Sequence, residues 1–356
     1  MAKLMRSYNI FQKCLIGKPP FIGYNGQVVP CCWHGTYDTK LKYMDKRLRQ
    51  TPFVRPDFNL YNNKLKDIIE SDEWWKVINE IPTKTPVLCS KKCSSFLKKK
   101  NRAVTTSSTT VRLKGDDALN KGTKDIILSK DKDAFKLAQE EFQKNGYVDL
   151  TIETTSRCTL KCPYCTRTIE ALDTPKPYSN GDLSLEVLED ICFTKPWKQL
   201  NDCGQYGDPV FLKHFHEFQD ILIRSLVKKY WFTTAATGRN KKWWQKSIDN
   251  FLKMEKSGTE VEFHFGIDGL HGASEKHRIG QKSQEIWNTM LECKAAGLNV
   301  YWQVIFTSEN EHQINEMKEL SIKHSIPLKF MFSGRFQKHN DPLMPYNPDL
   351  FWRNNE

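Results

Sequence analysis

The sequence lacks a hydrophobic run long enough to cross a membrane, since no stretch of about 18 apolar residues occurs in it. Its mean hydropathy is −0.61, which is that of a polar chain. Residues 1–20 also lack the uninterrupted apolar stretch of a secretory signal. These absences favour a soluble, cytoplasmic protein with no membrane partner.

Acidic residues are scarce in the first third of the chain. Residues 1–105 contain 20 Lys and Arg but only 8 Asp and Glu, whereas the remainder has 34 of each sign. The whole net charge of +12 therefore lies in this third. A basic region attracts acidic partners, so RNA is one candidate partner, although runs such as 98–100 are also common on solvated surfaces.

Cysteine, in contrast, is plentiful, with 11 residues in a chain of 356. In a small secreted domain this number would indicate disulfides, but a long chain without a signal is better explained by metal ligands in a reducing compartment. The hydrophobic content of 39% is sufficient for one large or two medium domains.

Three cysteines, Cys158, Cys162 and Cys165, directly follow a strand-like run at 147–153. Their spacings of four and three let one loop hold three irons of a [4Fe-4S] cluster and leave the fourth iron without a protein ligand. The alternatives are three structural cysteines, or a glutaredoxin-like dithiol at 162–165. The third cysteine, Cys158, and the long strand-helix pattern that follows count against the dithiol.

The motif CxxxCxxC with Tyr164 before its last cysteine resembles that of the radical S-adenosylmethionine enzymes. The resemblance implies that the methionine part of the cofactor binds the open iron. It also implies that the reduced cluster cleaves the sulfonium to give a 5'-deoxyadenosyl radical, which abstracts hydrogen from a substrate. An electron donor such as flavodoxin or ferredoxin is then expected.

From residue 147 onward, apolar residues alternate between periods of two and of three to four, which predicts parallel strands joined by helices. The six predicted strands are 147–153, 198–203, 229–235, 259–267, 299–306 and 327–332. The fold class is therefore α/β. Six such units agree with the open (βα)6 partial TIM barrel of the radical family, in which ligands bind beyond the carboxyl ends of the strands.

Later strand ends resemble the cofactor-binding segments of that family. Gly207 and Asp208 resemble a Gly-Gly-Glu-Pro segment that receives the cofactor's ammonium, with a shorter carboxylate here. Asp268 and downstream Arg278 resemble the Ser-x-Asp-Gly and Arg pattern, and Arg278 would bind the cofactor carboxylate. Gln303 on the fifth strand would meet the ribose. A plain Gly-Asp-Pro turn is the alternative for the first segment.

The first third contains a predicted hairpin around Gly26 and a set of cysteines. Their order resembles the auxiliary-cluster domains called SPASM and twitch, although these usually follow the core. The resemblance implies an auxiliary iron-sulfur cluster on Cys14, Cys31, Cys89 and Cys93, with Cys32 as the alternate to Cys31. Structural zinc on these sulfurs, or on three of them with His34, is the alternative. We expect His34 to be a surface residue instead.

These observations divide the chain into four parts. They are a SPASM/twitch-like cysteine-rich domain at 1–102, a Ser/Thr-rich linker and covering helix at 103–146, the radical core at 147–335 and a tail at 336–356. Auxiliary domains of this type suggest a peptide or protein substrate. The rival interpretation is a non-catalytic iron-sulfur or zinc protein that binds nucleic acid or senses redox state.

Overall fold

The computed structural model describes residues 14, 17–35, 52–81, 89, 108–111, 132–165, 167–168, 181–204, 206–331, 333 and 341–347. Its strands are β1 (Phe21–Ile22), β2 (Val28–Val29), β3 (Ser108–Val111), β4 (Asp149–Ile152), β5 (Gln199–Cys203), β6 (Lys229–Thr234), β7 (Glu260–Gly266), β8 (Asn299–Ile305) and β9 (Leu328–Met331). Its α-helices are α1 (Cys32–Gly35), α3 (Leu65–Glu70), α4 (Asp72–Glu80), α7 (Lys132–Asn145), α9 (Leu185–Thr194), α10 (Phe215–Arg224), α11 (Lys241–Lys256), α12 (Ala273–His277), α13 (Ser283–Ala295) and α14 (Ile314–His324). Short 3-10 helices are η2 (Pro56–Phe58), η4 (Pro209–Phe211) and η5 (Glu311–Gln313).

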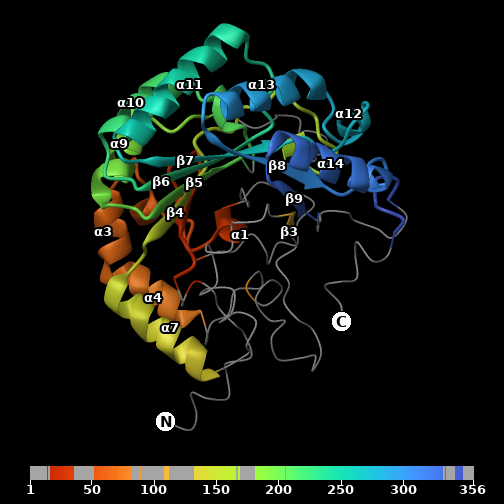
Figure 1. Ribbon diagram of the computed structural model, residues 1–356. Coiled ribbons are helices and arrows are strands. Elements are labelled where there is room, and N and C mark those ends of the chain that lie inside the picture. The colour runs from red at the N-terminus through yellow and green to blue at the C-terminus, as the bar shows by residue number, and fades with distance from the viewer. Residues whose placement is uncertain are drawn as a thin grey trace.

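One curved sheet organises the described part of the chain, in the order β2-β1-β4-β5-β6-β7-β8-β9-β3. Neighbours from β4 to β9 are all parallel. Helices α9, α10, α11 and α13 lie along its outer side, and α1 lies on the inner side (Figure 1). The expected α/β class and the six predicted parallel strands are confirmed.

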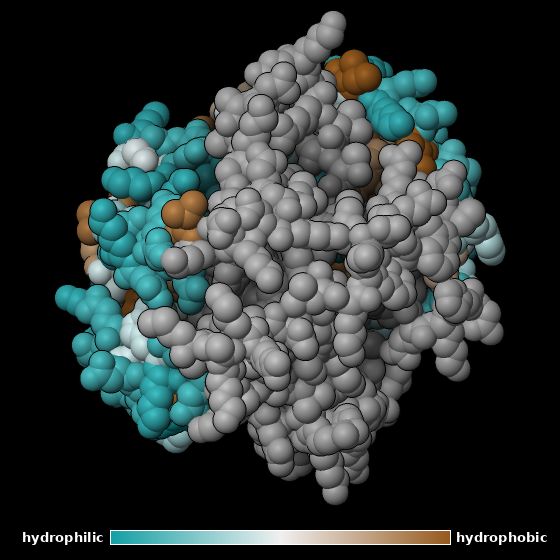
Figure 2. Space-filling model, turned by 90° about the horizontal axis from the view of Figure 1, so that it is seen from below, coloured by the Kyte–Doolittle hydropathy of each residue, from teal (hydrophilic) through white to brown (hydrophobic). Residues whose placement is uncertain are grey.

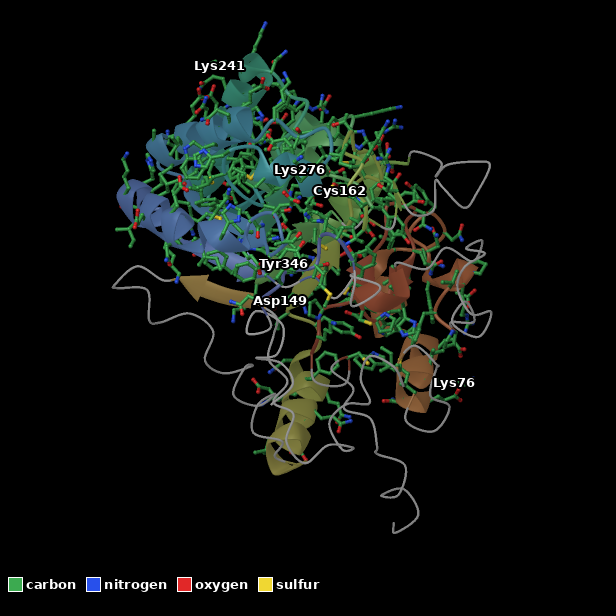
Figure 3. The ribbon with its side chains drawn as sticks, turned by 90° about the vertical axis from the view of Figure 1, so that its right-hand side faces the viewer. Lys76, Asp149, Cys162, Lys241, Lys276 and Tyr346 are labelled. Carbon is green, nitrogen blue, oxygen red and sulfur yellow. The ribbon has the colours of Figure 1, made fainter. Side chains whose placement is uncertain are left out.

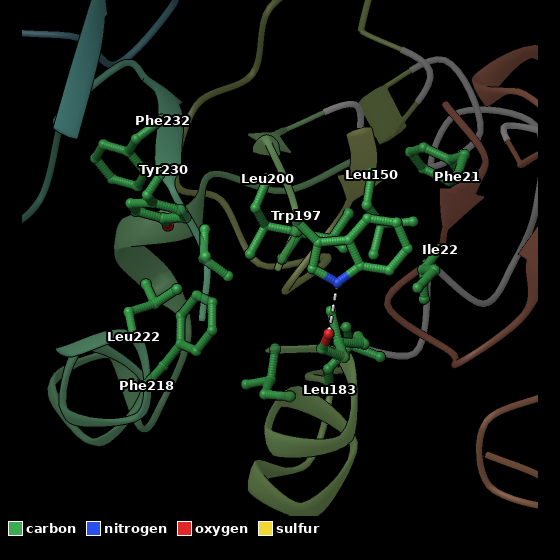
Figure 4. Close-up of a cluster of buried hydrophobic side chains, with 14 of the residues drawn as sticks. Phe21, Ile22, Leu150, Leu183, Trp197, Leu200, Phe218, Leu222, Tyr230 and Phe232 are labelled. Atoms are coloured by element: carbon green, nitrogen blue, oxygen red, sulfur yellow. Dashed lines mark hydrogen bonds between the residues drawn. The ribbon is translucent and has the colours of Figure 1, made fainter. Parts of the chain in front are cut away.

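The outer face of the sheet is apolar because alternate strand residues point toward the helices. On β6, for example, Tyr230 and Phe232 are fully buried; Tyr230 packs with Phe218 and Phe232 with Phe215, both of α10. Trp197 lies in the same core, where its indole N–H donates to the carbonyl of Ile191 at 2.7 Å (Figure 4). Burial of this face fixes the register, since a slip of one residue would expose every apolar side chain.

The N-terminal hairpin is part of this sheet. β1 pairs with β2 antiparallel and with β4 parallel, so that Phe21 lies opposite Thr151. Gly26 lies in the turn with a φ of 78°, a left-handed conformation that glycine adopts without steric cost. The hairpin was predicted from the sequence, but its addition to the sheet that carries the cysteine loop was not.

Residues 108–111 differ from the linker expected for this region. They form β3, which pairs antiparallel with β9 at the other end of the sheet order. Three of the four residues are β-branched, which suits an edge strand. The helix predicted within 103–146 is present as α7.

The described surface is mostly hydrophilic when seen from below, with separate hydrophobic spots (Figure 2). Exposed large hydrophobic residues are scattered over several elements, among them Tyr61, Leu137 and Ile322. No helix among the described residues has both the length and the apolar character that a membrane crossing requires.

Candidate functional site

The candidate site lies at the carboxyl ends of β4 to β8. Parallel strands end at the same edge of a sheet, so the loops that follow them meet there. Asp149 begins β4, and Cys162 lies beyond the last residue of that strand, higher in the view of Figure 3. The predicted cysteine and cofactor residues therefore share one edge of the sheet.

The cysteine loop is fixed to its neighbours by its backbone. The amide of Lys161 donates to the carbonyl of Ile279 at 2.9 Å, and that of Cys165 donates to the carbonyl of Cys162 at 3.1 Å. Arg157, at the start of the loop, pairs with Asp182 at 2.9 Å. The bond from Lys161 holds the loop against the segment that follows α12, and the pair with Asp182 holds it against the segment before α9.

The three thiols of the loop are partly buried and lie near one another. Burial raises the pKa of Cys158 to about 12, with smaller contributions from Asp208 and the other two cysteines. Burial also raises the pKa of Cys162 to about 11, against the opposing charge of Arg278. Binding of metal would have to release these protons.

The three thiols of the loop are the donor type that an iron-sulfur cluster requires. Among the described residues, no group of three or more His, Cys, Asp or Glu side chains could hold one metal ion. A cubane instead binds each thiolate through a different iron, so the sulfurs need not converge on one point. The amide of Leu160 lies 3.4 Å from the Cys158 sulfur, the kind of N–H to sulfur bond that supports a cluster ligand.

Gly207 lies against the start of the cysteine loop, where only glycine fits. A Cβ at this position would lie 2.1 Å from the carbonyl oxygen of Thr155 and 2.9 Å from the amide of Arg157. Glu153, at the end of β4, accepts hydrogen bonds from the amides of Tyr206 and of Gly207, the latter at 3.3 Å. The segment after β5 is thus joined to β4 by a buried carboxylate.

The Asp208 carboxylate is buried and already held by three groups. It accepts from the hydroxyl of Thr234 at 2.6 Å, the amide of Ala235 at 2.8 Å and the amide of Val210 at 3.3 Å. Burial raises the pKa of Asp208, and these bonds together with Arg278 oppose the rise. The shorter side chain is therefore fixed between β5 and β6, near Cys158.

Asp268 and Arg278 form a buried ion pair. The guanidinium donates from Nε at 2.7 Å and from Nη2 at 3.1 Å, while His277 Nδ1 donates at 2.6 Å and the amide of Ile305 at 2.9 Å. Burial alone would raise the pKa of Asp268, but Arg278 and His277 lower it to about 2. The ionised carboxylate thus joins β7, α12 and β8.

The absence of a side chain at Gly266 is explained by this ion pair. A Cβ there would lie 2.7 Å from Nη2 and 2.9 Å from Cζ of Arg278. The guanidinium occupies the space that a serine of the family pattern would need. Gln303 lies opposite Gly266 in the register of β7 and β8, and only 8% of its surface is exposed.

Tyr164 is part of the cysteine loop, and its side chain contacts two other segments of the chain. Its hydroxyl donates to Asp341 near the end of the chain, and its ring centroid lies 6.1 Å from that of His277. Burial, followed by the Asp341 carboxylate, raises the pKa of Tyr164. Neither contact was expected from the sequence.

Three of the four predicted auxiliary ligands lie in the described residues, and Cys93 lies outside them. Cys14 and Cys31 are both close enough to the buried Tyr147 to add to the rise in its pKa, which is caused chiefly by burial. His34 Nε2 lies 3.3 Å from the Cys89 sulfur. His34 is 2% exposed, so its expected surface position is wrong, because it packs on Phe53.

Cys32 has different surroundings from its neighbour Cys31. Its thiol adds to the rise in the pKa of Cys203, which is caused mainly by burial. Cys203 is the last residue of β5, so Cys32 lies near the carboxyl end of that strand. Which of the two cysteines binds an auxiliary metal stays a prediction.

No protein-family model matches the sequence, and no curated protein matches it either. Among solved structures, the chain is similar to SuiB of Streptococcus suis bound to S-adenosylmethionine, with 13% identity and a TM-score of 0.43 over 60% of this chain and 48% of SuiB. The anSMEcpe protein with bound AdoMet has 17% identity and a TM-score of 0.44 over 57% and 54%. SuiB bound to the precursor peptide SuiA has 14% identity and a TM-score of 0.41 over 71% and 51%. These matches span about half the length of those proteins.

Several residues of the site were missed because their role depends on distant partners. Glu153 was noticeable only as a charge at the end of an apolar strand, and His277 as the neighbour of Arg278. Asn310 begins a segment after β8 where a cofactor contact was expected, but its hydrogen bonds to the carbonyls of Asp268 and Ile305 were not expected. Asp341 had no signal in the sequence.

Proposed function

We propose that this protein is a radical S-adenosylmethionine enzyme that modifies a peptide or protein. The observation that carries the proposal is the loop of Cys158, Cys162 and Cys165 at the carboxyl edge of a parallel sheet. Its thiols lie within the electrostatic influence of Asp208 and Arg278. A three-thiol loop beside one buried carboxylate and one buried guanidinium suits a cluster and a zwitterionic amino-acid cofactor together.

Each residue has a part in this proposal. The three cysteines would hold the cluster, which together with S-adenosylmethionine would supply a carbon-centred radical. Asp208 would receive the ammonium of the cofactor beside the backbone of Gly207. Arg278 uses Nε and Nη2 for Asp268, which leaves Nη1, unbonded among the described residues, for the cofactor carboxylate.

The other contacts follow from position. Tyr164 and Gln303 would line the base and ribose of the cofactor, since both lie at the same edge of the sheet. Cys14, Cys31, Cys89 and Cys93 would hold an auxiliary cluster, with Cys32 as alternate. A polypeptide substrate agrees with such a domain, RNA is a second partner that the basic first third would fit, and flavodoxin or ferredoxin would supply electrons.

The test is formation of 5'-deoxyadenosine. The protein is reconstituted with iron and sulfide without oxygen, and dithionite and S-adenosylmethionine are then added. We expect 5'-deoxyadenosine from the wild type and none from a Cys158→Ala variant. A wild type that holds a full cluster but gives no product above background would support the non-catalytic rival.

The auxiliary site needs a separate measurement. Iron and zinc are counted in a variant with Cys158, Cys162 and Cys165 all changed to Ala. Iron of about four atoms per chain is expected to remain. Zinc without iron would refute an auxiliary cluster while leaving the catalytic one untouched.

A further inference from the structure

The segment 341–347, here called the C-terminal segment, is attached to the loop between β8 and α14. The hydroxyl of Ser308 donates to the carbonyl of Pro342 at 2.6 Å, and the Ser308 amide donates to the carbonyl of Leu343 at 3.1 Å. At its other end, Glu311 accepts from the amides of Tyr346 at 3.0 Å and Asn347 at 2.9 Å. Two anchors therefore hold the segment across the carboxyl end of β8.

The first residue of the C-terminal segment reaches the cysteine loop. Asp341 accepts a hydrogen bond from the Tyr164 hydroxyl, and the same carboxylate oxygen accepts from the amide of Leu343 at 3.0 Å. The second bond fixes the carboxylate within its own turn. Asp341 therefore offers Tyr164 a fixed acceptor, 177 positions further along the chain.

The orientation of the Tyr164 ring is also restricted by His277. Its ring is tilted by 33° against that of His277, which in turn donates to Asp268. A ring held at its hydroxyl and beside a fixed imidazole loses less rotational freedom when a flat ligand packs on it. Two contacts, one at the hydroxyl and one beside the ring, therefore restrict Tyr164.

We propose that Asp341 is a positioning residue for Tyr164, and that the C-terminal segment thereby forms part of the cofactor site. The inference rests on the proposed function, because the ligand it prepares for is the adenosyl part of S-adenosylmethionine. It adds to that function a residue from outside the barrel. A tail that only packs against the barrel would leave cofactor affinity unchanged when Asp341 is altered.

The experiment measures the Kd of S-adenosylmethionine by equilibrium dialysis on the full, reconstituted chain. Asp341→Ala should weaken binding about tenfold, since a hydrogen bond to a charged group is worth about 1.5 kcal/mol or more. Asp341→Asn keeps an acceptor and should stay within about threefold of the wild type. Asp249→Asn, on an exposed turn of α11, is the control and should bind as the wild type does.

A double-mutant comparison distinguishes a positioning role of Asp341 from a general loss of structure. Tyr164→Phe should weaken binding by a similar factor, and the double variant should bind no more weakly than Asp341→Ala, because both changes remove the same bond. Hydrogen exchange of the metal-free chain gives a readout without activity: residues 158–165 should exchange faster in Asp341→Ala.

Four outcomes are decisive. Wild-type affinity in Asp341→Ala, or losses that multiply in the double variant, would overturn the inference. If Asp341→Ala fails to retain its cluster, unchanged affinity in Tyr164→Phe would overturn it just as well. Failure of the wild type itself to bind S-adenosylmethionine would refute the proposed function instead.

Discussion

Replacement of Asp268 by Asn tests the ion pair at the centre of the site. The carboxylate is fully buried and accepts from Arg278, His277 and the amide of Ile305. Asn has one acceptor oxygen, and its NH2 group would face donors. The guanidinium would then stay charged and buried without its partner, which typically costs about 3–5 kcal/mol.

The expected change in melting temperature follows from chain length. Unfolding entropy is about 2.1 cal/mol/K per residue, so 356 residues give about 0.75 kcal/mol/K. A loss of about 3–5 kcal/mol therefore lowers Tm by about 4–7 °C. Circular dichroism at 222 nm of the metal-free chain measures it. The control is Glu73→Gln, which breaks an exposed pair with Arg55 of the same 2.7 Å length and should leave Tm within about 1 °C.

The same pair predicts a dependence on pH. The pKa of Asp268 falls from 3.8 to about 2 on folding, so its contribution of roughly 2 kcal/mol is complete above about pH 4 and is lost as the pH falls through 2. The difference in Tm between wild type and Asp268→Asn should therefore shrink below about pH 4. A difference that is absent at pH 7, or constant down to pH 2.5, would refute the reasoning.

Three further predictions concern neighbouring positions. Gly207→Ala should prevent stable folding of the cysteine loop, because the new Cβ meets the Thr155 carbonyl at 2.1 Å; soluble expression with a normal cluster would contradict this. Gly266→Ser should displace Arg278 and cost about 1–3 kcal/mol, measured by thermal unfolding. Arg278→Lys keeps the charge but not the paired bond to Asp268, so Tm should fall and the Kd for S-adenosylmethionine should rise about tenfold, and a wild-type value would remove this residue from the site.

The sequence was informative where a feature is local. Strand and helix periods are read over a few residues, and the cysteine spacing lies within one loop, so β4 to β9 and the position of Cys158 could be predicted. Asp268 and Arg278 were both selected from the sequence because they lie ten positions apart in one motif, but their ion pair with each other was not expected.

Features made by distant segments could not be predicted. The pairing of β1 with β4 and of β3 with β9 depends on backbone hydrogen bonds, which leave no pattern in side-chain type. His34 looked like a polar surface residue, yet its neighbours Phe53 and Cys89 enclose it. The Tyr164–Asp341 bond joins positions with no shared motif, so only the folded chain brings them together.

The position of β1 also has a consequence for the order of assembly. The Ile22 carbonyl accepts from the amide of Glu153 at 2.8 Å, so the strand that precedes the cysteine loop is completed by residues from the beginning of the chain. On the ribosome, the first hairpin must wait for more than a hundred further residues before this neighbour emerges. Such a long loop closes slowly. The strand that leads into the cysteine loop is therefore completed only after Phe21–Ile22 and Thr151–Ile152 have met.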